Sequence, residues 1–143
     1  MDSELIVVED SDDDFDALQR TCRSLNFEGV LRRFIDAESL LSDIRHWDTE
    51  PRASGKRRVI LLDLNLPGVD GRELLVQLKS DTALSAVPVV VYTTSSNLRD
   101  VAFCYQNHAN AYHVKPMDLA ALESGVKAML DYWFAHNELP RHT

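Results

Sequence analysis

The feature that most constrains this chain is a pair of short segments that are apolar at every position. Residues 5–8 read Leu-Ile-Val-Val, and residues 59–62 read Val-Ile-Leu-Leu. A strand carries such an unbroken apolar run when both of its faces are buried, as in a parallel sheet covered by helices on both sides. The two segments therefore predict an α/β fold built around a parallel sheet.

Further β-rich segments alternate with stretches of helical periodicity along the rest of the chain. The additional strands are expected at residues 30–35, 87–92 and 111–114. Helices are expected from Ser11, from about 37 to 46, from near Gly71, from near Asn97, and from Asp118 to about Phe134. Since 143 residues suit one domain, the order predicts a single unit of five β-α repeats.

Two details of this assignment are open to test. Helical spacing places Val101, Ala102 and Tyr105 on the inner face of the fourth helix. Residues 47–58 lose periodicity and collect proline, glycine and basic residues, so we expect an exposed loop there, more often a solvated connection than a docking patch.

Composition excludes several classes of protein. With 45% hydrophobic and 27% charged residues the chain is typical of globular proteins. A formal net charge of −8 disfavours a broad nucleic-acid-binding surface. Because no apolar run approaches the roughly 20 residues of a membrane span, and the first strand leaves no room for a signal peptide, we expect a cytoplasmic protein whose partners are proteins. Cys22 and Cys104 have no metal or redox spacing and are expected to be reduced thiols.

Polar side chains follow the predicted strands at the point where each strand ends. They are Glu9 and Asp10 after the first strand, Asp63 after the third, Thr93 and Thr94 at the fourth, and Lys115 after the fifth. In an open parallel sheet, ligands bind outside the carboxyl ends of the strands. We therefore expect these groups to converge on one site.

These residue types suit phosphoryl transfer to a carboxylate. A carboxylate that attacks a phosphoryl donor is an anion approaching an anion, so cationic groups must offset the charge. Glu9, Asp10 and Asp63 together offer the oxygen ligands that Mg²⁺ prefers. Lys115 supplies a mobile positive charge, and the Thr93 hydroxyl can donate a hydrogen bond.

Each of these residues also has a plainer interpretation. Acidic residues near a helix start are often solvated charges that interact with the helix dipole, and we interpret Asp12, Asp13, Asp14 and Asp16 in that way. Glu9 and Asp10 differ because they end a buried strand. Tyr112 alternates in a strand, where half-buried packing is the ordinary role.

The motifs and their spacing resemble a known family. Glu9-Asp10, the segment from Leu62 to Gly71, Thr93, and Lys115-Pro116 resemble the receiver domains of two-component response regulators, and the likeness covers nearly the whole chain. Thr93 lies 30 residues and Lys115 lies 52 residues beyond Asp63, as in that family. The resemblance implies a flavodoxin-like (βα)5 fold, a doubly wound parallel sheet with strand order 2-1-3-4-5.

The same resemblance assigns roles to individual residues. Asp63 would be the phosphoacceptor, with Lys115 and Thr93 assisting. Glu9, Asp10, Asp63 and the backbone carbonyl of Asn65 would hold Mg²⁺ or Mn²⁺, with Ca²⁺ as a substitute in crystals. Thr93 and Tyr112 would be the switch pair, and the Lys115–Pro116 peptide bond would be cis.

A narrower resemblance concerns the partner. Residues 91–95, residues 104–112, the loop before the third strand and the tail are similar to single-domain regulators of phytochrome-type histidine kinases. This implies a histidine kinase as phosphoryl donor and an output through protein contact. Residues 1–135 would form the receiver domain, and 136–143 a C-terminal tail that acts as a dimer arm. We expect a homodimer through the apolar residues near this end, which are Leu130, Trp133, Phe134 and Leu139.

Three other functions are weighed against a non-enzymatic phosphoacceptor, which would assist only its own phosphotransfer and dephosphorylation. An aspartyl-nucleophile phosphatase would carry D-x-D, whereas Asn65 occupies the second position here. A flavodoxin-type cofactor binder is disfavoured by the acidic loop after Val8. A pseudo-receiver scaffold would not need the full set of five polar groups.

Overall fold

The chain folds into three layers, with a parallel sheet between two groups of helices. The computed structural model describes residues 2–47 and 55–141. The strands are β1 (Ser3–Val8), β2 (Val30–Phe34), β3 (Arg57–Leu62), β4 (Val89–Thr93) and β5 (Ala111–Val114). The helices are α1 (Asp12–Ser24), α2 (Ala37–Ile44), α3 (Gly71–Ser80), α4 (Leu98–Gln106) and α5 (Leu119–Leu130), followed by the π-helix η3 (Asp131–His136).

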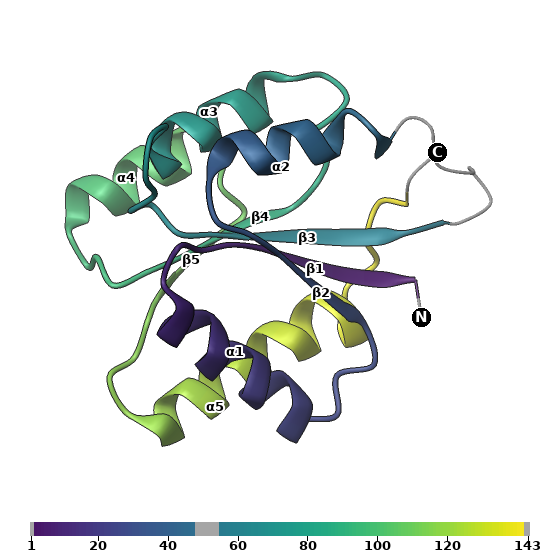
Figure 1. Ribbon diagram of the computed structural model, residues 1–143, viewed down its shortest axis with the longest axis vertical. Helices are drawn as coiled ribbons and strands as arrows, with labels where there is room; N and C mark the ends of the chain where they lie inside the picture. The colour runs from purple at the N-terminus through teal and green to yellow at the C-terminus, as the bar shows by residue number, and fades with distance from the viewer. Residues whose placement is uncertain (1, 48–54, 142–143) are drawn as a thin grey trace.

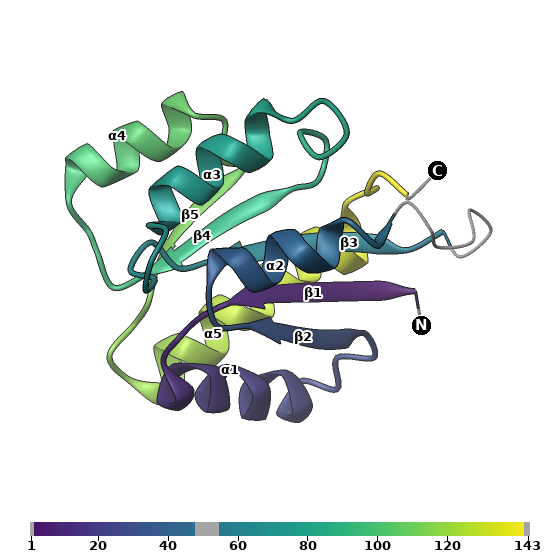
Figure 2. The ribbon, with the colours of Figure 1, turned by 45° about the horizontal axis from the view of Figure 1, so that its top comes forward.

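The sheet has the strand order β2-β1-β3-β4-β5, with every neighbouring pair parallel. Helices α2, α3 and α4 cover one face, while α1 and α5 cover the other (Figure 1). The same arrangement is visible in the tilted view, where β1 and β3 lie in the middle of the sheet (Figure 2). The predicted α/β fold and strand order are confirmed.

The two apolar strands are buried on both faces, as their sequence predicts. Ile6 and Ile60 pack in the core below α2, α3 and α4. Their neighbours Leu5 and Val59 pack in the second core, which α1 and α5 cover. Successive side chains of a strand point to opposite faces, so a strand between two cores needs apolar residues at every position.

The predicted helix starts are also confirmed. The Ser11 hydroxyl accepts a hydrogen bond from the backbone N–H of Asp14 at 3.2 Å, which caps α1. The side chains of Asn97 and Asp118 cap α4 and α5 in the same way. These caps satisfy backbone donors that have no partner inside the helix, and they fix where each helix leaves the edge of the sheet.

The inner face of α4 differs from the prediction. Ala102 and Tyr105 are exposed, whereas Cys104 is fully buried and Phe103 packs against the core. The helix is rotated relative to the expected face because its sequence offers two overlapping apolar stripes. The buried sulfur side chain, which behaves as a small apolar group, belongs to the stripe that faces the sheet.

The expectation of an exposed loop at residues 47–58 is wrong at both of its ends. Trp47 is buried, and Arg57 and Arg58 begin strand β3, with only 5% of Arg58 exposed. The Arg58 guanidinium lies 4.1 Å from the Trp47 ring centre and binds Glu4, so its charge is compensated inside the fold. The intervening residues 48–54, which include Arg52, lie outside the described residues.

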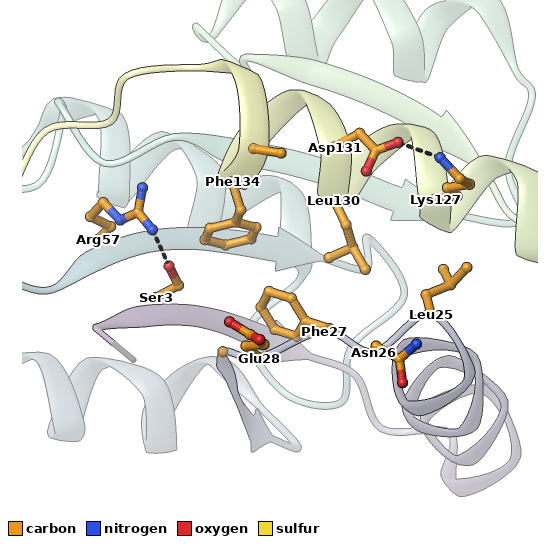
Figure 3. A pocket seen from close by; sticks show the side chains of 12 residues that line it. Ser3, Leu25, Asn26, Phe27, Glu28, Arg57, Lys127, Leu130, Asp131 and Phe134 are labelled. Atoms are coloured by element: carbon orange, nitrogen blue, oxygen red, sulfur yellow. Dashed lines mark hydrogen bonds and ion pairs between the residues drawn. The ribbon is translucent and has the colours of Figure 1, made fainter.

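The C-terminal residues expected to be exposed are packed against the chain itself. Leu130, Trp133 and Leu139 are buried, and Phe134 contacts Phe27 at a ring-centre distance of 5.3 Å. Figure 3 shows Leu130 and Phe134 pointing towards Phe27 at a cavity of about 310 Å³. Leu130, Trp133 and Leu139 are therefore not available for the dimer contact that the sequence predicts, because they pack into the core, whereas Phe134 is partly buried and Tyr132 of the same π-helix is exposed.

The end of the described chain also folds back onto its own domain. Arg141 forms an isolated bridge with Arg57, and its guanidinium donates to the Asp2 carboxylate at 2.8 Å. Residues 137–141 therefore lie beside the amino ends of β1 and β3. No helix in the described ranges is long and apolar enough to cross a membrane.

Candidate functional site

The carboxyl edge of the sheet brings the predicted polar groups together. The backbone N–H of Asp63 donates to the carbonyl of Val8 at 3.1 Å, which holds the Asp63 backbone beside the end of β1. At the other side, the backbone N–H of Lys115 donates to the carbonyl of Thr93 at 2.7 Å. These ladder-like bonds continue the parallel pairing beyond the strands, so the side chains that follow the strands share one edge.

Three carboxylates form the acidic centre of this edge. One carboxylate oxygen from each of Glu9, Asp10 and Asp63 lies within 4.8 Å of the other two. Glu9 and Asp63 are buried, whereas Asp10 is exposed. Three hard oxygen donors at this spacing, open to solvent on one side, fit a divalent cation that keeps some of its water ligands.

Lys115 is the cation that the described structure places among these acids. Its ammonium group donates to Glu9 at 2.5 Å, to Asp14 at 2.8 Å and to Asp63 at 3.1 Å. Burial disfavours the charged lysine, but the hydrogen bonds to Asp14 and Glu9 and the charge of Asp63 outweigh it and raise the pKa of Lys115. The lysine therefore stays protonated and offsets part of the negative charge.

The negative charge of the site is not fully offset. Burial, and the neighbouring Asp63 carboxylate, raise the pKa of Glu9 to about 7 even though Lys115 opposes that shift. A carboxylate that resists ionisation beside a lysine lies in a strongly negative environment. A divalent cation at this position would remove the repulsion, which is a second sign that the residues fit a metal.

Asp14 belongs to the site although the sequence interpretation treated it as a helix-start charge. It lies in the first turn of α1, beside Asp12 and Asp13, and its carboxylate binds Lys115 from 101 residues away in the sequence. Three consecutive aspartates have the same relation to the helix dipole. Helical periodicity could have indicated which of them faces β5, but only the fold establishes the contact with Lys115.

Thr93 lies at the same edge and is fully buried. Leu62 pairs with Val91 in the sheet, so Thr93 stands one residue beyond the level of Asp63. Its hydroxyl accepts a hydrogen bond from the backbone N–H of Ser95 at 3.4 Å. Thr93 is thus joined to the loop that begins α4.

Tyr112 contacts the same loop from β5. Its hydroxyl donates to the carbonyl of Ser95 at 2.8 Å, and the ring is partly buried against the core. The Ser95 hydroxyl in turn donates to Asp100, which also binds Arg72 of α3. The predicted switch residues Thr93 and Tyr112 therefore meet at Ser95, within a network that joins α3, α4 and β5.

The loop after Asp63 is held tightly in place. The backbone N–H of Asn65 donates to the Asp63 carboxylate at 3.2 Å. A Cβ atom on Gly71 would lie 2.3 Å from the Asp63 carbonyl, so only glycine lets α3 begin this close to the loop. The metal-binding role of the Asn65 carbonyl stays a prediction.

The expected cis peptide before Pro116 is not found. The described residues contain no cis peptide bond, so the Lys115–Pro116 bond is trans and that expectation is wrong here. Trans is the lower-energy isomer of an X-Pro bond, and with it the Lys115 side chain reaches Glu9, Asp14 and Asp63.

Comparison with known proteins supports the same assignment. Residues 5–127 match the family described as response regulator receiver domain. The chain belongs to that family. The receiver domain is 35% identical over 136 residues to the probable methanogenesis regulatory protein FilR2 of Methanothrix harundinacea, covering 95% of this chain and 86% of FilR2. It is 34% identical over 139 residues to the response regulator Rcp1 of Synechocystis, covering 95% and 92%.

Solved structures agree with the fold of this receiver domain. The phosphorylated cyanobacterial phytochrome response regulator RcpA matches with a TM-score of 0.83 and 33% identity, over 96% of this chain and 97% of that one. The Mn²⁺-bound form of Rcp1 matches with a TM-score of 0.79 and 33% identity, over 96% and 98%. This receiver domain is therefore a response regulator of two-component signalling that is similar to phytochrome-associated regulators.

Proposed function

We propose that Asp63 accepts a phosphoryl group from the phosphohistidine of a histidine kinase. The observation that carries the proposal is that Asp63 belongs to a cluster of three carboxylates and also accepts a hydrogen bond from the ammonium group of Lys115. Asp63 is buried but lies next to the exposed Asp10, so a donor can approach from the solvent side. The product is an acyl phosphate on the Asp63 side chain.

The residues around Asp63 meet the charge requirements of this transfer. The transferring group spreads negative charge over three oxygens, and catalysis consists mainly of positioning and electrostatic stabilisation. Lys115 can move its hydrogen bond from Asp63 to a phosphoryl oxygen without leaving the site. The Thr93 hydroxyl can turn from the Ser95 backbone towards the same group, and the backbone N–H of Asn65 already donates to the Asp63 carboxylate.

The cation that this chemistry needs is Mg²⁺ in our proposal. Glu9, Asp10 and Asp63 would hold it, together with the carbonyl of Asn65, and it would neutralise charge on the phosphoryl oxygens. Mn²⁺ bound to Rcp1, which is 34% identical to this chain, supports a divalent ion of this class. Ca²⁺ could occupy the same oxygen ligands in crystals.

The signal would leave through protein contacts. A phosphoryl group adds a charge of about −1.5 to −2 at neutral pH. This charge would draw the Thr93 hydroxyl towards the phosphoryl group and alter the contacts of Ser95 with Tyr112 and Asp100. The face made by α4, β5 and α5 would then change. The likeness to the phytochrome response regulator RcpA supports a phytochrome-type histidine kinase as donor.

Incubation with acetyl phosphate and Mg²⁺, followed by intact mass measurement, tests the proposal. Wild type should gain one phosphoryl mass, and Asp63→Asn should gain none. Asp13→Asn is the matched control, because Asp13 is exposed on α1 and lies outside the cluster. A phosphoryl adduct on the Asp63→Asn variant, or none on wild type in the presence of Mg²⁺, would contradict the assignment.

The same sample separates the phosphoacceptor from an aspartyl phosphatase. A receiver domain should consume acetyl phosphate only as fast as its own acyl phosphate hydrolyses, and it should leave generic phosphate esters intact. Sustained hydrolysis of such esters that depends on Asp63 would favour the enzyme instead.

A homodimer stays a prediction of the sequence. The apolar residues first assigned to its interface, Leu130, Trp133, Phe134 and Leu139, pack within the chain, so another surface would have to supply the contact. Sedimentation at tens of micromolar protein, with and without a phosphoryl mimic, tests it, and a monomer under both conditions would exclude the dimer.

A further inference from the structure

The ammonium group of Lys115 has three N–H donors, and three carboxylates receive them. The acceptors are Glu9 at 2.5 Å, Asp14 at 2.8 Å and Asp63 at 3.1 Å. The lysine side chain is nearly buried, with 8% of its surface exposed. No donor is left over for a phosphoryl oxygen, so at least one of these contacts must be exchanged when Asp63 carries a phosphoryl group.

Two of the three contacts conflict with the roles proposed for Glu9 and Asp63. A metal ion would compete with Lys115 for the Glu9 carboxylate, and a phosphoryl group on Asp63 would change the oxygen to which the lysine donates. Asp14 lies outside the group of three carboxylates that could hold a metal. Its contact with Lys115 is the one that neither the metal nor the phosphoryl group takes away.

The surroundings of Asp14 suit an anchor. The Ser11 cap binds the backbone N–H of Asp14 itself, so the position of this residue is fixed at the start of α1. The backbone of Lys115 is fixed by its bond to Thr93. Between these two fixed backbones lies the flexible lysine side chain, and such a side chain loses considerable rotamer entropy when it is held in one place.

We propose that Asp14 is a positioning residue, which holds the Lys115 ammonium group beside Asp63 throughout the phosphorylation cycle. The inference rests on the proposed function of Asp63. Asp14 contacts neither the donor nor the phosphoryl group, and it acts only by restricting where the lysine charge lies. Its side chain is 44% exposed, so Asp14 forms the solvent side of the lysine site.

Asp14→Ala tests the proposal in the full chain. We expect the maximal rate of phosphorylation by acetyl phosphate to fall on the order of tenfold, within the range of couplings between contacting residues. The Mg²⁺ concentration at half-maximal rate should stay the same, because Asp14 is not in the metal group. Asp13→Ala is the matched control, since it removes the same charge from the same exposed helix turn, and its rate should equal that of wild type.

A double-mutant cycle with Lys115→Ala distinguishes a positioning role from a merely structural one, because it compares the loss of phosphorylation rate caused by Asp14→Ala with and without the lysine. If Asp14 acts through the lysine, Asp14→Ala should cause no further loss in the Lys115→Ala background, and Asp14→Asn, which keeps a hydrogen-bond acceptor, should recover part of the rate. Equal rates for Asp14→Ala and wild type, or equal losses in both backgrounds, would overturn the inference. Either result leaves the proposed function intact as long as wild type gains its phosphoryl mass, whereas a wild type that gains none refutes the proposed function itself.

Discussion

A buried glutamate lies at each end of strand β1, Glu4 within the strand and Glu9 directly after it, and the two have opposite surroundings. Glu4, near the amino end, is approached by three cations: Arg58 at 3.2 Å, Lys56 at 3.3 Å and Arg32 at 3.7 Å. Glu9, at the carboxyl end, shares its surroundings with the carboxylates of Asp10 and Asp63 and binds one lysine. Both side chains are more than nine-tenths buried.

The difference shows how one strand can serve both stability and function. At the amino end the cations around Glu4 compensate its charge, and the resulting network ties β1 to β3 and reaches Asp43 of α2 through Arg32. At the carboxyl end negative charges exceed positive ones, and the pKa of Glu9 rises to about 7 through burial and the nearby Asp63. Charge complementarity within the fold marks the structural end, and an uncompensated excess marks the end that needs a ligand.

The largest effect should follow from removing the glutamate of the compensated end. Glu4→Gln removes the buried carboxylate that Arg58, Lys56 and Arg32 approach, and breaking a buried ion pair from one side costs about 3 kcal/mol of folding free energy. Urea denaturation measures the loss. Glu123→Gln, on the exposed face of α5, is the matched control and should change stability by less than about 0.5 kcal/mol. A comparably small loss for Glu4→Gln would contradict a structural role for the network.

The second effect should come from adding a divalent cation, for which the carboxyl end offers three carboxylates. Mg²⁺ at one hundred times its dissociation constant should raise the free energy of unfolding of wild type by about 2.7 kcal/mol. EDTA should reverse the gain, and Asp10→Asn should reduce it. Urea denaturation with and without Mg²⁺ measures both. A gain of the same size in Asp10→Asn would place the ion elsewhere on the surface.

A smaller effect of opposite sign is expected from neutralising Glu9. Glu9→Gln removes one of the crowded carboxylates, so the metal-free protein should become more stable by about 1 kcal/mol, while the stabilisation by Mg²⁺ should largely disappear. The two variants therefore distinguish the ends of β1, because Glu4→Gln should lower the free energy of unfolding and Glu9→Gln should raise it. Destabilisation at both ends, measured without metal, would break the comparison.

The sequence predicts the edge of the sheet better than it predicts the outer surfaces. The apolar runs, the helix starts at Ser11, Asn97 and Asp118, and the polar groups after each strand all depend on local pattern, and the fold confirms their placement. Local pattern is enough here because parallel strands bring their carboxyl ends to one edge. The convergence of Glu9, Asp10 and Asp63 follows from the topology alone.

The features that the sequence misses depend on contacts between distant residues. Arg58 looks like part of a basic loop until Glu4 is placed opposite it in the neighbouring strand. Trp133 looks like an exposed aromatic until the π-helix turns it into the core. Asp14 is interpreted as a helix-start charge until the fold shows that its carboxylate binds Lys115, 101 residues further along the chain. In each case the role of the side chain depends on a contact with residues distant in sequence, which local sequence pattern does not reveal.

The smallest effect concerns two buried thiols, Cys22 and Cys104, whose pKa values are raised mainly by burial. Burial raises the pKa of the Cys22 thiol and of the Cys104 thiol to about 11. For a thiol whose pKa is raised on folding, the stabilising contribution is complete below the unfolded pKa near 9 and is lost as the pH rises through 11. Stability should therefore change by less than about 0.5 kcal/mol on this account between pH 7 and 8, while alkylation at pH 8 should be about 100-fold slower in the native protein than in urea. A native thiol that reacts as fast as an unfolded one would show that these sites are open, and that burial alone does not keep a thiol neutral in this fold.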